Sequence, residues 1–252
     1  MFLRWGAFFL SGLLVACGQP TPLPDMERGE IGRVVRIIDG DSLVLDTGQS
    51  IRLVSIEAPV LRVRDGDPEV YAEESARALE DLVMGRRVRL YYPGLTRDRY
   101  DRALAHIVTE GDAGRTIWVN KALVESGAVR VRLYPDTDAR GSELLAAEQD
   151  ARDANIGIWK KRVYKVRKSD RIDPEFRGFT IFTAQLERQT PRETGGCIWS
   201  LRRSTASVEV YREADNVCEF ESGTMLRLRG YLADNRLRLE HELHAQLLEG
   251  TT

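Results

Sequence analysis

Two neighbouring segments decide the fold of this chain: Asp39-Gly40-Asp41-Ser42 and, after it, Arg52-Leu53-Val54-Ser55-Ile56-Glu57-Ala58-Pro59-Val60. Residues 32–38 and 42–45 alternate apolar and polar side chains, which is typical of strands, and the Asp39-Gly40-Asp41 segment predicts a tight turn between them. Residues 49–56 predict a third strand. These segments therefore place acidic side chains and an arginine on neighbouring short strands.

The following segments predict helices that cover this meander. Residues 68–84 carry apolar side chains at helical spacing and end at Gly85, which is a typical helix stop. Two more strands are expected at 87–92 and 103–108, and two more helices at 116–125 and 142–154. This order predicts a small β-barrel with helices, in the α+β class.

The C-terminal third has a different pattern, with strands and no long helix. A charged, exposed linker is expected at 160–173, and a second small all-β domain at 174–252, for which an oligonucleotide-binding-like barrel is one candidate. The strands are expected at 179–187, 197–202, 206–211, 224–232 and 236–240. Arginine alternates with leucine at 226–229 and 237–239, which indicates one arginine-bearing face. That face is either a solvated surface or a surface for nucleic acid or an anionic glycan.

The first 17 residues are nearly all apolar or small, and they are too few to span a membrane. They predict a signal peptide at 1–17, and Leu14-Val15-Ala16-Cys17-Gly18 resembles a bacterial lipobox. The resemblance implies export, a lipid on Cys17 and, from Gly18, anchoring to the outer membrane of the cell envelope. The alternative is an ordinary signal peptide with a chance cysteine. Residues 18–30 contain three prolines and predict a flexible tether.

The predicted lipidation of Cys17 determines what is expected of the other cysteines. The chain has three cysteines, and if Cys17 carries lipid, Cys197 and Cys218 remain in an exported region, where a disulfide is expected. Two free thiols are an alternative, whereas two cysteines without nearby histidines do not support a metal site.

Composition is that of an ordinary globular protein. The 252 residues carry a formal net charge of -2, so the strongly basic character of many nucleic-acid-binding proteins is missing. Residues 31–166 hold 22 Lys and Arg and 22 Asp and Glu, a difference of zero. This balance lowers the expectation of nucleic-acid binding, although a local groove can still be basic.

Several separated blocks carry a resemblance to the staphylococcal nuclease (thermonuclease) family over residues 31–166. They are Asp39-Gly40-Asp41-Ser42, residues 52–59, Asp98-Arg99-Tyr100-Asp101-Arg102, residues 119–124 and residues 155–159. The resemblance implies an oligonucleotide/oligosaccharide-binding barrel and calcium-dependent cleavage of phosphodiester bonds in single-stranded DNA or RNA. It implies no protein partner.

The family motif also implies the metal-binding residues. Asp41 matches a metal-ligand aspartate, and Glu57 lies where the family usually has a second aspartate. The carbonyl of Ala58 matches a main-chain ligand, and these oxygens suit Ca²⁺. The alternative for Asp41 is a carboxylate that caps the turn.

Arginines and tyrosines of the motif imply phosphate and base binding. Arg52 and Arg102 match the two phosphate-binding arginines, and a guanidinium binds phosphate through two parallel hydrogen bonds. The alternative is a pair of surface arginines bridged to nearby aspartates. Arg99 and Tyr100 resemble residues that line the nucleotide pocket, and Tyr134 is a further candidate for base stacking.

One position departs from the family pattern. Val60 stands where the family has a glutamate that acts as general base, and losing such a base costs on the order of 10²–10⁴ in rate. Glu57 could replace that base, as could a glutamate at 69, 73 or 74. The chain is therefore expected to be a weakened nuclease or a catalytically inactive, envelope-anchored module that binds nucleic acid or another polyanion. A structural envelope lipoprotein is a third reading.

The histidines offer no further site. His241 and His244 lie in His-Glu-Leu-His, one residue short of the zinc-protease spacing, and they are expected at the surface.

Overall fold

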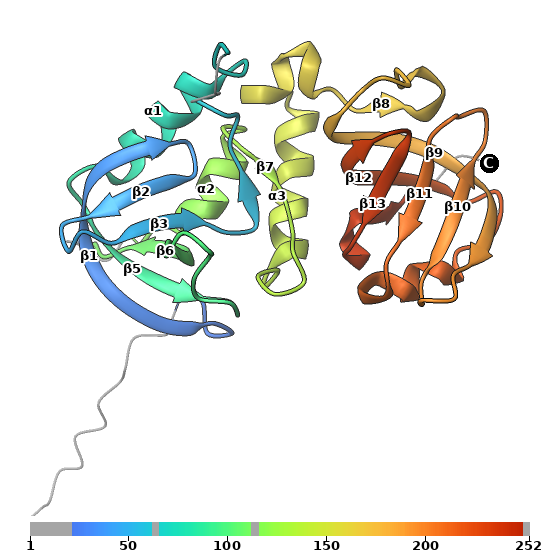
Figure 1. The fold of residues 1–252 in the computed structure, drawn as a ribbon. Coiled ribbons are helices and arrows are strands. Elements are labelled where there is room, and N and C mark those ends of the chain that lie inside the picture. Colours follow the sequence, from blue (N-terminus) through green and yellow to red (C-terminus); the bar gives the residue numbers. More distant parts are fainter. Residues whose placement is uncertain (1–21, 62–65, 112–115, 249–252) are drawn as a thin grey trace, which may run out of the picture.

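The computed structural model describes residues 22–61, 66–111 and 116–248, and its first half is a closed barrel (Figure 1). Five strands form the ring in the order β1-β2-β3-β6-β5, and β3 runs parallel to β6. The bounds are β1 Glu27–Asp39, β2 Ser42–Leu45, β3 Ser50–Leu53, β5 Arg87–Tyr92 and β6 Ala103–Thr109. This strand order is that of an oligonucleotide-binding barrel, as expected from the sequence.

Three helices cover the barrel and close its core. They are α1 Ala72–Val83, α2 Val119–Glu125 and α3 Gly141–Asp153, which confirms the three expected helices; the first two begin later than expected, and α3 is shifted by one residue. Their apolar sides join the barrel interior in one cluster that contains Leu53, Leu79 and Leu123. A further two-stranded ribbon pairs β4 Ile56–Glu57 with β7 Arg130–Val131.

The C-terminal region forms a second barrel with the same strand order. β12 pairs with both β13 and β9, so the ring β9-β10-β11-β13-β12 closes, and β11 runs parallel to β13 as β3 does to β6. The short strands β8 Arg167–Lys168 and β14 Ala245–Leu247 extend this sheet. The ring strands are β9 Gly178–Pro191, β10 Cys197–Leu201, β11 Ser207–Val210, β12 Met225–Ala233 and β13 Arg236–Leu239.

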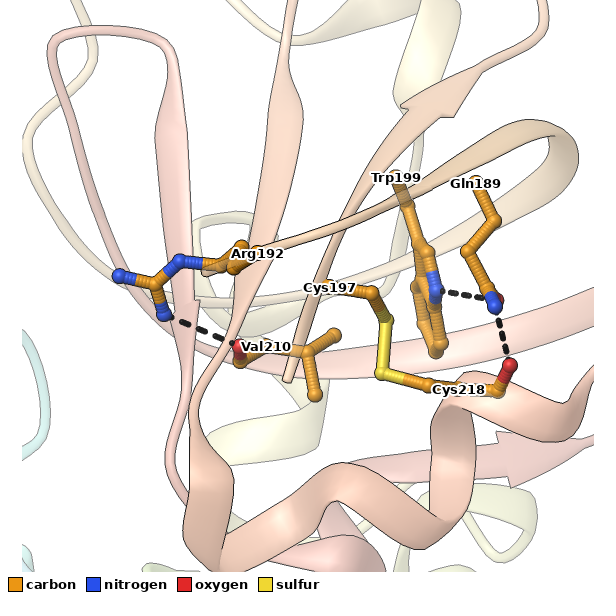
Figure 2. The surroundings of a disulfide bond; sticks show 6 residues. All are labelled: Gln189, Arg192, Cys197, Trp199, Val210 and Cys218. Atoms are coloured by element: carbon orange, nitrogen blue, oxygen red, sulfur yellow. Dashed lines mark hydrogen bonds between the residues drawn. A yellow bond between two sulfur atoms is a disulfide. The ribbon is translucent and has the colours of Figure 1, made fainter. Parts of the chain in front are cut away.

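A disulfide links β10 to the 3-10 helix Arg212–Glu219 that follows β11 (Figure 2). The predicted pairing of Cys197 with Cys218 is present. Beside it, the indole N–H of Trp199 donates to Gln189 at 3.0 Å, and the Gln189 amide donates to the carbonyl of Cys218. The disulfide therefore ties the connection between the third and fourth strands to the wall of the second barrel.

Two segments that were expected to be flexible or exposed are folded. Leu23 and Met26 are buried against the first barrel and β1 begins at Glu27, so the prediction of a tether extending to residue 30 is wrong there. The segment expected as a linker at 160–173 contains the buried Tyr164, whose hydroxyl donates to the carbonyl of Val70 at 2.8 Å. The predicted signal peptide and lipidation at Cys17 lie outside the described residues. Within those residues, no helix has the length and apolar character needed to cross a membrane.

The two barrels are joined through α3, which lies between them (Figure 1). Arg229 of β12 is 1% exposed, and its guanidinium pairs with Glu148 of α3, which is fully buried. The same guanidinium donates to the carbonyl of Val131 at 3.0 Å, while the N–H of Val131 donates to Glu148 at 2.7 Å. The expectation of a solvated or ligand-binding arginine face is therefore wrong for Arg229, because this side chain faces a buried carboxylate of the first barrel's helix.

Both histidines near the C-terminus are also buried, contrary to the prediction that they lie at the surface. His241 contacts the carboxylate of Asp138 at 2.6 Å, and His244 packs behind it. The short motif that contains both histidines lies at the contact between the barrels. The partner of His241, Asp138, is 103 residues away in the sequence, so the local sequence pattern could not predict this contact.

Candidate functional site

The turn between β1 and β2 places Asp41 inside the protein. Asp41 is 1% exposed, and its carboxylate accepts hydrogen bonds from the N–H of Ala58 at 2.6 Å and the hydroxyl of Ser42 at 3.0 Å. The same carboxylate forms an ion pair with Arg52 of β3. Gly40 is required here because a Cβ would lie 1.9 Å from the Ser75 hydroxyl of α1. The helix therefore packs directly onto the turn that holds this aspartate.

Glu57 lies on β4, beyond a kink at Ser55 with a φ of 62°. Pairing with β7 places Arg130 opposite Glu57, and the Glu57 carboxylate pairs with Arg130 at 2.6 Å and with Arg132. Burial by itself raises the pKa of Glu57, but the two guanidinium groups outweigh burial and hold this pKa below its usual value. Glu57 is thus an ionised carboxylate held between two arginines.

Arg52 and Arg102 come together at one pocket, as the sequence implies. Arg52 reaches it from β3, and Arg102 from the connection between β5 and β6, where it pairs with Asp98 at 2.7 Å. Burial lowers the pKa of the Arg52 guanidinium; Asp39 and Glu57 oppose this shift, and Arg102 adds to it. An anion placed between the two arginines would relieve their mutual repulsion.

Three other predicted side chains, those of Arg99, Tyr100 and Tyr134, line the same pocket of about 550 Å³, whereas the predicted metal ligands lie outside its lining. The Arg99 guanidinium lies 4.7 Å from the ring centroid of Tyr100 and donates to its hydroxyl at 2.6 Å. Tyr100 is 65% exposed and Tyr134 is 42% exposed, so both rings are open to a ligand. Arg132 also lines the pocket, with its guanidinium 5.2 Å from the Tyr134 ring centroid.

Asp101, the residue before Arg102, adopts a left-handed backbone conformation with a φ of 62°. Aspartate tolerates this conformation better than most residues. Its carboxylate lies 3.3 Å from Arg97. The negative charge of Asp101 in the turn that presents Arg102 is therefore countered by Arg97.

Val60 is 46% exposed at the edge of this region. Its main-chain N–H donates to the Glu69 carboxylate at 2.9 Å, so Glu69 holds the loop rather than a water molecule. Glu73 and Glu74 lie in the first turn of α1, and within the described residues no hydrogen bond joins either side chain to the site. Among the residues that the structure describes, none of these three glutamates is therefore held at the site by a hydrogen bond.

The predicted calcium ligands do not form a calcium site as they are arranged. Asp41 and Glu57 are both engaged by guanidinium groups, and Ala58 contacts Asp41 through its N–H. In the part of the chain that the structure describes, no group of three or more His, Cys, Asp and Glu side chains is placed to hold a metal ion. Ca²⁺ takes about 6–8 oxygen ligands, and the carboxylates of Asp41 and Glu57 would have to leave their arginine partners to contribute to them.

Sequence reasoning missed Arg130 and Arg132, the residues that determine the state of Glu57. They lie 73 and 75 residues after Glu57. The available signal was the alternation Arg130-Val131-Arg132, in which a buried valine separates two arginines that face the same side. That pattern indicates a strand face with two cations, but it does not reveal which carboxylate they meet.

The fold is that of the oligonucleotide-binding barrel proteins, and one pocket of the first barrel brings together arginines and exposed tyrosines. A family model described as Staphylococcal nuclease homologue matches residues 50–161. The chain is 33% identical over 131 residues to an uncharacterized endonuclease of Escherichia coli O157:H7, covering 51% of this chain and 76% of that protein. It is 28% identical over 137 residues to the thermonuclease of Staphylococcus intermedius, covering 53% and 79%. The chain belongs to the staphylococcal nuclease homologue family, and its function is of the nuclease type.

Proposed function

We propose that this protein binds a phosphodiester of single-stranded DNA or RNA between Arg52 and Arg102 and hydrolyses it slowly. The observation that carries the proposal is the convergence of these arginines with Arg99 and two exposed tyrosines on one pocket. Guanidinium groups neutralise the phosphoryl oxygens, and a neighbouring ring stacks on a base. Slow hydrolysis follows from Val60, which offers no atom that can accept a proton from water.

The family supports calcium as a cofactor, whereas the carboxylates that would hold the ion, those of Asp41 and Glu57, are engaged by arginines. Cleavage should therefore be measured with added Ca²⁺ and with a chelator. Activity that survives the chelator would show that the arginine pocket works without the ion. Activity that is lost would show that the ion is required.

The test uses the full-length chain in detergent with fluorescent single-stranded DNA and RNA. Removing Arg102 should weaken binding by about 10- to 100-fold, since a hydrogen-bonded contact with a charged group contributes about 1.5–3 kcal/mol. Arg36→Ala is the matched control, because Arg36 is exposed on β1 and lies outside the pocket. Unchanged affinity in Arg102→Ala would overturn the assignment of the pocket.

A catalytically inactive module that binds nucleic acid or another polyanion is the second candidate. Val60 and the pairing of Glu57 with two arginines favour it. Binding that depends on Arg102, without cleavage on prolonged incubation, would establish this function. The absence of both binding and cleavage would reject both candidates.

We also propose that Cys17 carries lipid and anchors the protein to the bacterial outer membrane. The support is the apolar segment that ends in Leu14-Val15-Ala16-Cys17-Gly18. Labelling cells with a clickable fatty acid should mark the wild type and not Cys17→Ser, and fractionation should locate the labelled protein. A wild type that stays unlabelled would contradict the anchor.

A further inference from the structure

A second cavity, of about 580 Å³, lies between the two barrels. Tyr231, Arg236 and Arg238 of the second barrel line it, and so do Arg132 and Tyr134 of the first. Arg132 and Tyr134 also line the arginine pocket described above. The two cavities therefore adjoin along these two shared side chains.

Each cavity includes at least one residue of the connection between the fourth and fifth strands of its own barrel and at least one residue of the third strand. The arginine pocket is built on the connection between the fourth and fifth strands of the first ring, residues 93–102. The second cavity is built on the corresponding connection between β12 and β13, at Asp234, and on Glu209 of the third strand. Barrels of this class bind oligonucleotides on the face of the second and third strands, beside the fourth-to-fifth connection.

The lining of the second cavity suits bases and phosphates together. Tyr231 is 49% exposed, and Arg236 and Arg238 are exposed on β13. Phe179 forms the wall between the barrels and lies 4.5 Å below the guanidinium of Arg130, measured to its ring centroid. Aromatic rings stack on bases of any sequence, and arginines follow the backbone of a strand.

The acidic side chains of this cavity are mostly paired with arginines. Glu209 pairs with Arg192 at 2.8 Å and lies 3.9 Å from Arg236, and Asp234 pairs with Arg177. Glu240 has no ion-pair partner within the described residues. Glu240 is therefore the carboxylate whose charge most directly opposes an anionic ligand.

The cavity is preformed because buried contacts fix one barrel against the other. Arg229 pairs with Glu148, and His241 contacts Asp138 at 2.6 Å. A ligand that spans the two cavities does not have to order the barrels first, which lowers the entropic cost of binding.

We propose that a single strand of DNA or RNA leaves the arginine pocket past Arg132 and Tyr134 and enters the second cavity. There, Tyr231 stacks on a base and Arg238 binds a phosphate. This inference rests on the proposed function and extends it by assigning the second barrel a subsite for the same strand.

The experiment measures affinity by fluorescence anisotropy with the full-length chain in detergent. The probes are oligothymidylates of about 4 and about 12 nucleotides, because one barrel of this class covers about 4–16 nucleotides. The wild type should bind the longer probe more tightly. Tyr231→Ala should weaken binding of the longer probe by about 5- to 100-fold and leave the shorter probe unchanged. Glu240→Gln should tighten binding of the longer probe.

Tyr231→Phe keeps the ring and should bind as the wild type does. Ile198→Ala is the control for loss of an exposed apolar side chain, since Ile198 is 44% exposed and lines neither cavity. Circular dichroism confirms that each variant is folded. Equal affinity for both probes, or an equal loss of heparin binding in Tyr231→Ala, would overturn the inference, because heparin has no bases.

The same measurements separate this inference from the proposed function. If the short probe binds through Arg102 and length adds nothing, the arginine pocket stands and the second subsite is rejected. If the long probe binds through Tyr231 and Arg102→Ala has no effect, the second subsite stands and the proposed function is rejected.

Discussion

Glu57 lies between Arg130 and Arg132, and its carboxylate is hydrogen bonded to both guanidinium groups. A carboxylate held in this way is a poor proton acceptor, since the two positive charges favour its ionised form and lower its pKa. Glu57 is therefore not free to replace the general base. The position that lacks the expected glutamate is residue 60, which is a valine.

The first prediction concerns residue 60. Val60→Glu should raise phosphodiester cleavage by on the order of 10²-fold or more, because a positioned base contributes about 10²–10⁴ in rate. Glutamine has the same size as glutamate but cannot accept a proton at neutral pH, so Val60→Gln should cleave at the wild-type rate. The rates are measured on fluorescent single-stranded DNA. Equal rates in both variants would show that the site lacks more than a base.

The second prediction concerns the ion pair between the barrels. Glu148→Gln should lower the free energy of unfolding by about 3–5 kcal/mol, because it leaves the buried guanidinium of Arg229 without its carboxylate. Arg152 also pairs with Glu148 at 2.5 Å, so a variant in which Glu148, Arg229 and Arg152 are all replaced by methionine removes all three charges and should cost less than Glu148→Gln alone. Urea unfolding measures all three proteins. A loss below about 1 kcal/mol in Glu148→Gln would contradict the prediction.

The third prediction concerns pH. Burial lowers the pKa of His106 to about 3 and of His244 to about 3, whereas an unfolded histidine titrates near 6.5. Between these pH values the unfolded chain binds more protons, so stability is full above about pH 6.5 and falls as the pH is lowered toward 3. The slope is at most about 1.4 kcal/mol per pH unit for each histidine.

The test compares unfolding from pH 7 to pH 4 in the wild type and in His106→Gln. The glutamine can still accept the hydrogen bond that Trp118 donates to His106 at 3.2 Å. The free energy of unfolding of the variant should fall less steeply with decreasing pH, and the difference in slope should be at most the contribution of one histidine. Parallel curves would mean that His106 titrates normally in the folded protein.

The fourth prediction concerns the disulfide. Cys197 and Cys218 are separated by 21 residues, and a closed loop of that length contributes about 3 kcal/mol to stability in the chain-entropy model. A Cys197→Ser, Cys218→Ser double variant should lose about this amount in chemical unfolding. A reducing agent should destabilise the wild type and leave the double variant unchanged. A response of the variant to the reductant would point to an effect elsewhere in the chain.

Features that depend on neighbouring residues could be predicted from the sequence. The five strands of each ring and the three helices follow from alternation and helical spacing, whereas the arginine pocket is implied by the resemblance to the nuclease family in the blocks around Asp41 and Arg102. The partners of Glu57 and Arg229 could not be predicted, because each is set by a contact 73 to 81 residues away. For Arg229, strict alternation with leucine favoured an exposed face, and the burial of a salt bridge between barrels overrode that local pattern.

The burial of Arg229 against the first barrel also determines where the chain can be truncated. Both hydrogen-bonding groups of the Val131 main chain are satisfied by this ion pair, and Val131 lies between the two arginines that hold Glu57. A truncation after Val166 would leave Glu148 without Arg229 and would remove the donor to Val131. The second barrel is therefore part of the structure that supports the first barrel. A fragment that contains only residues 50–161 lacks the contacts that Glu148 and Val131 make in the whole chain.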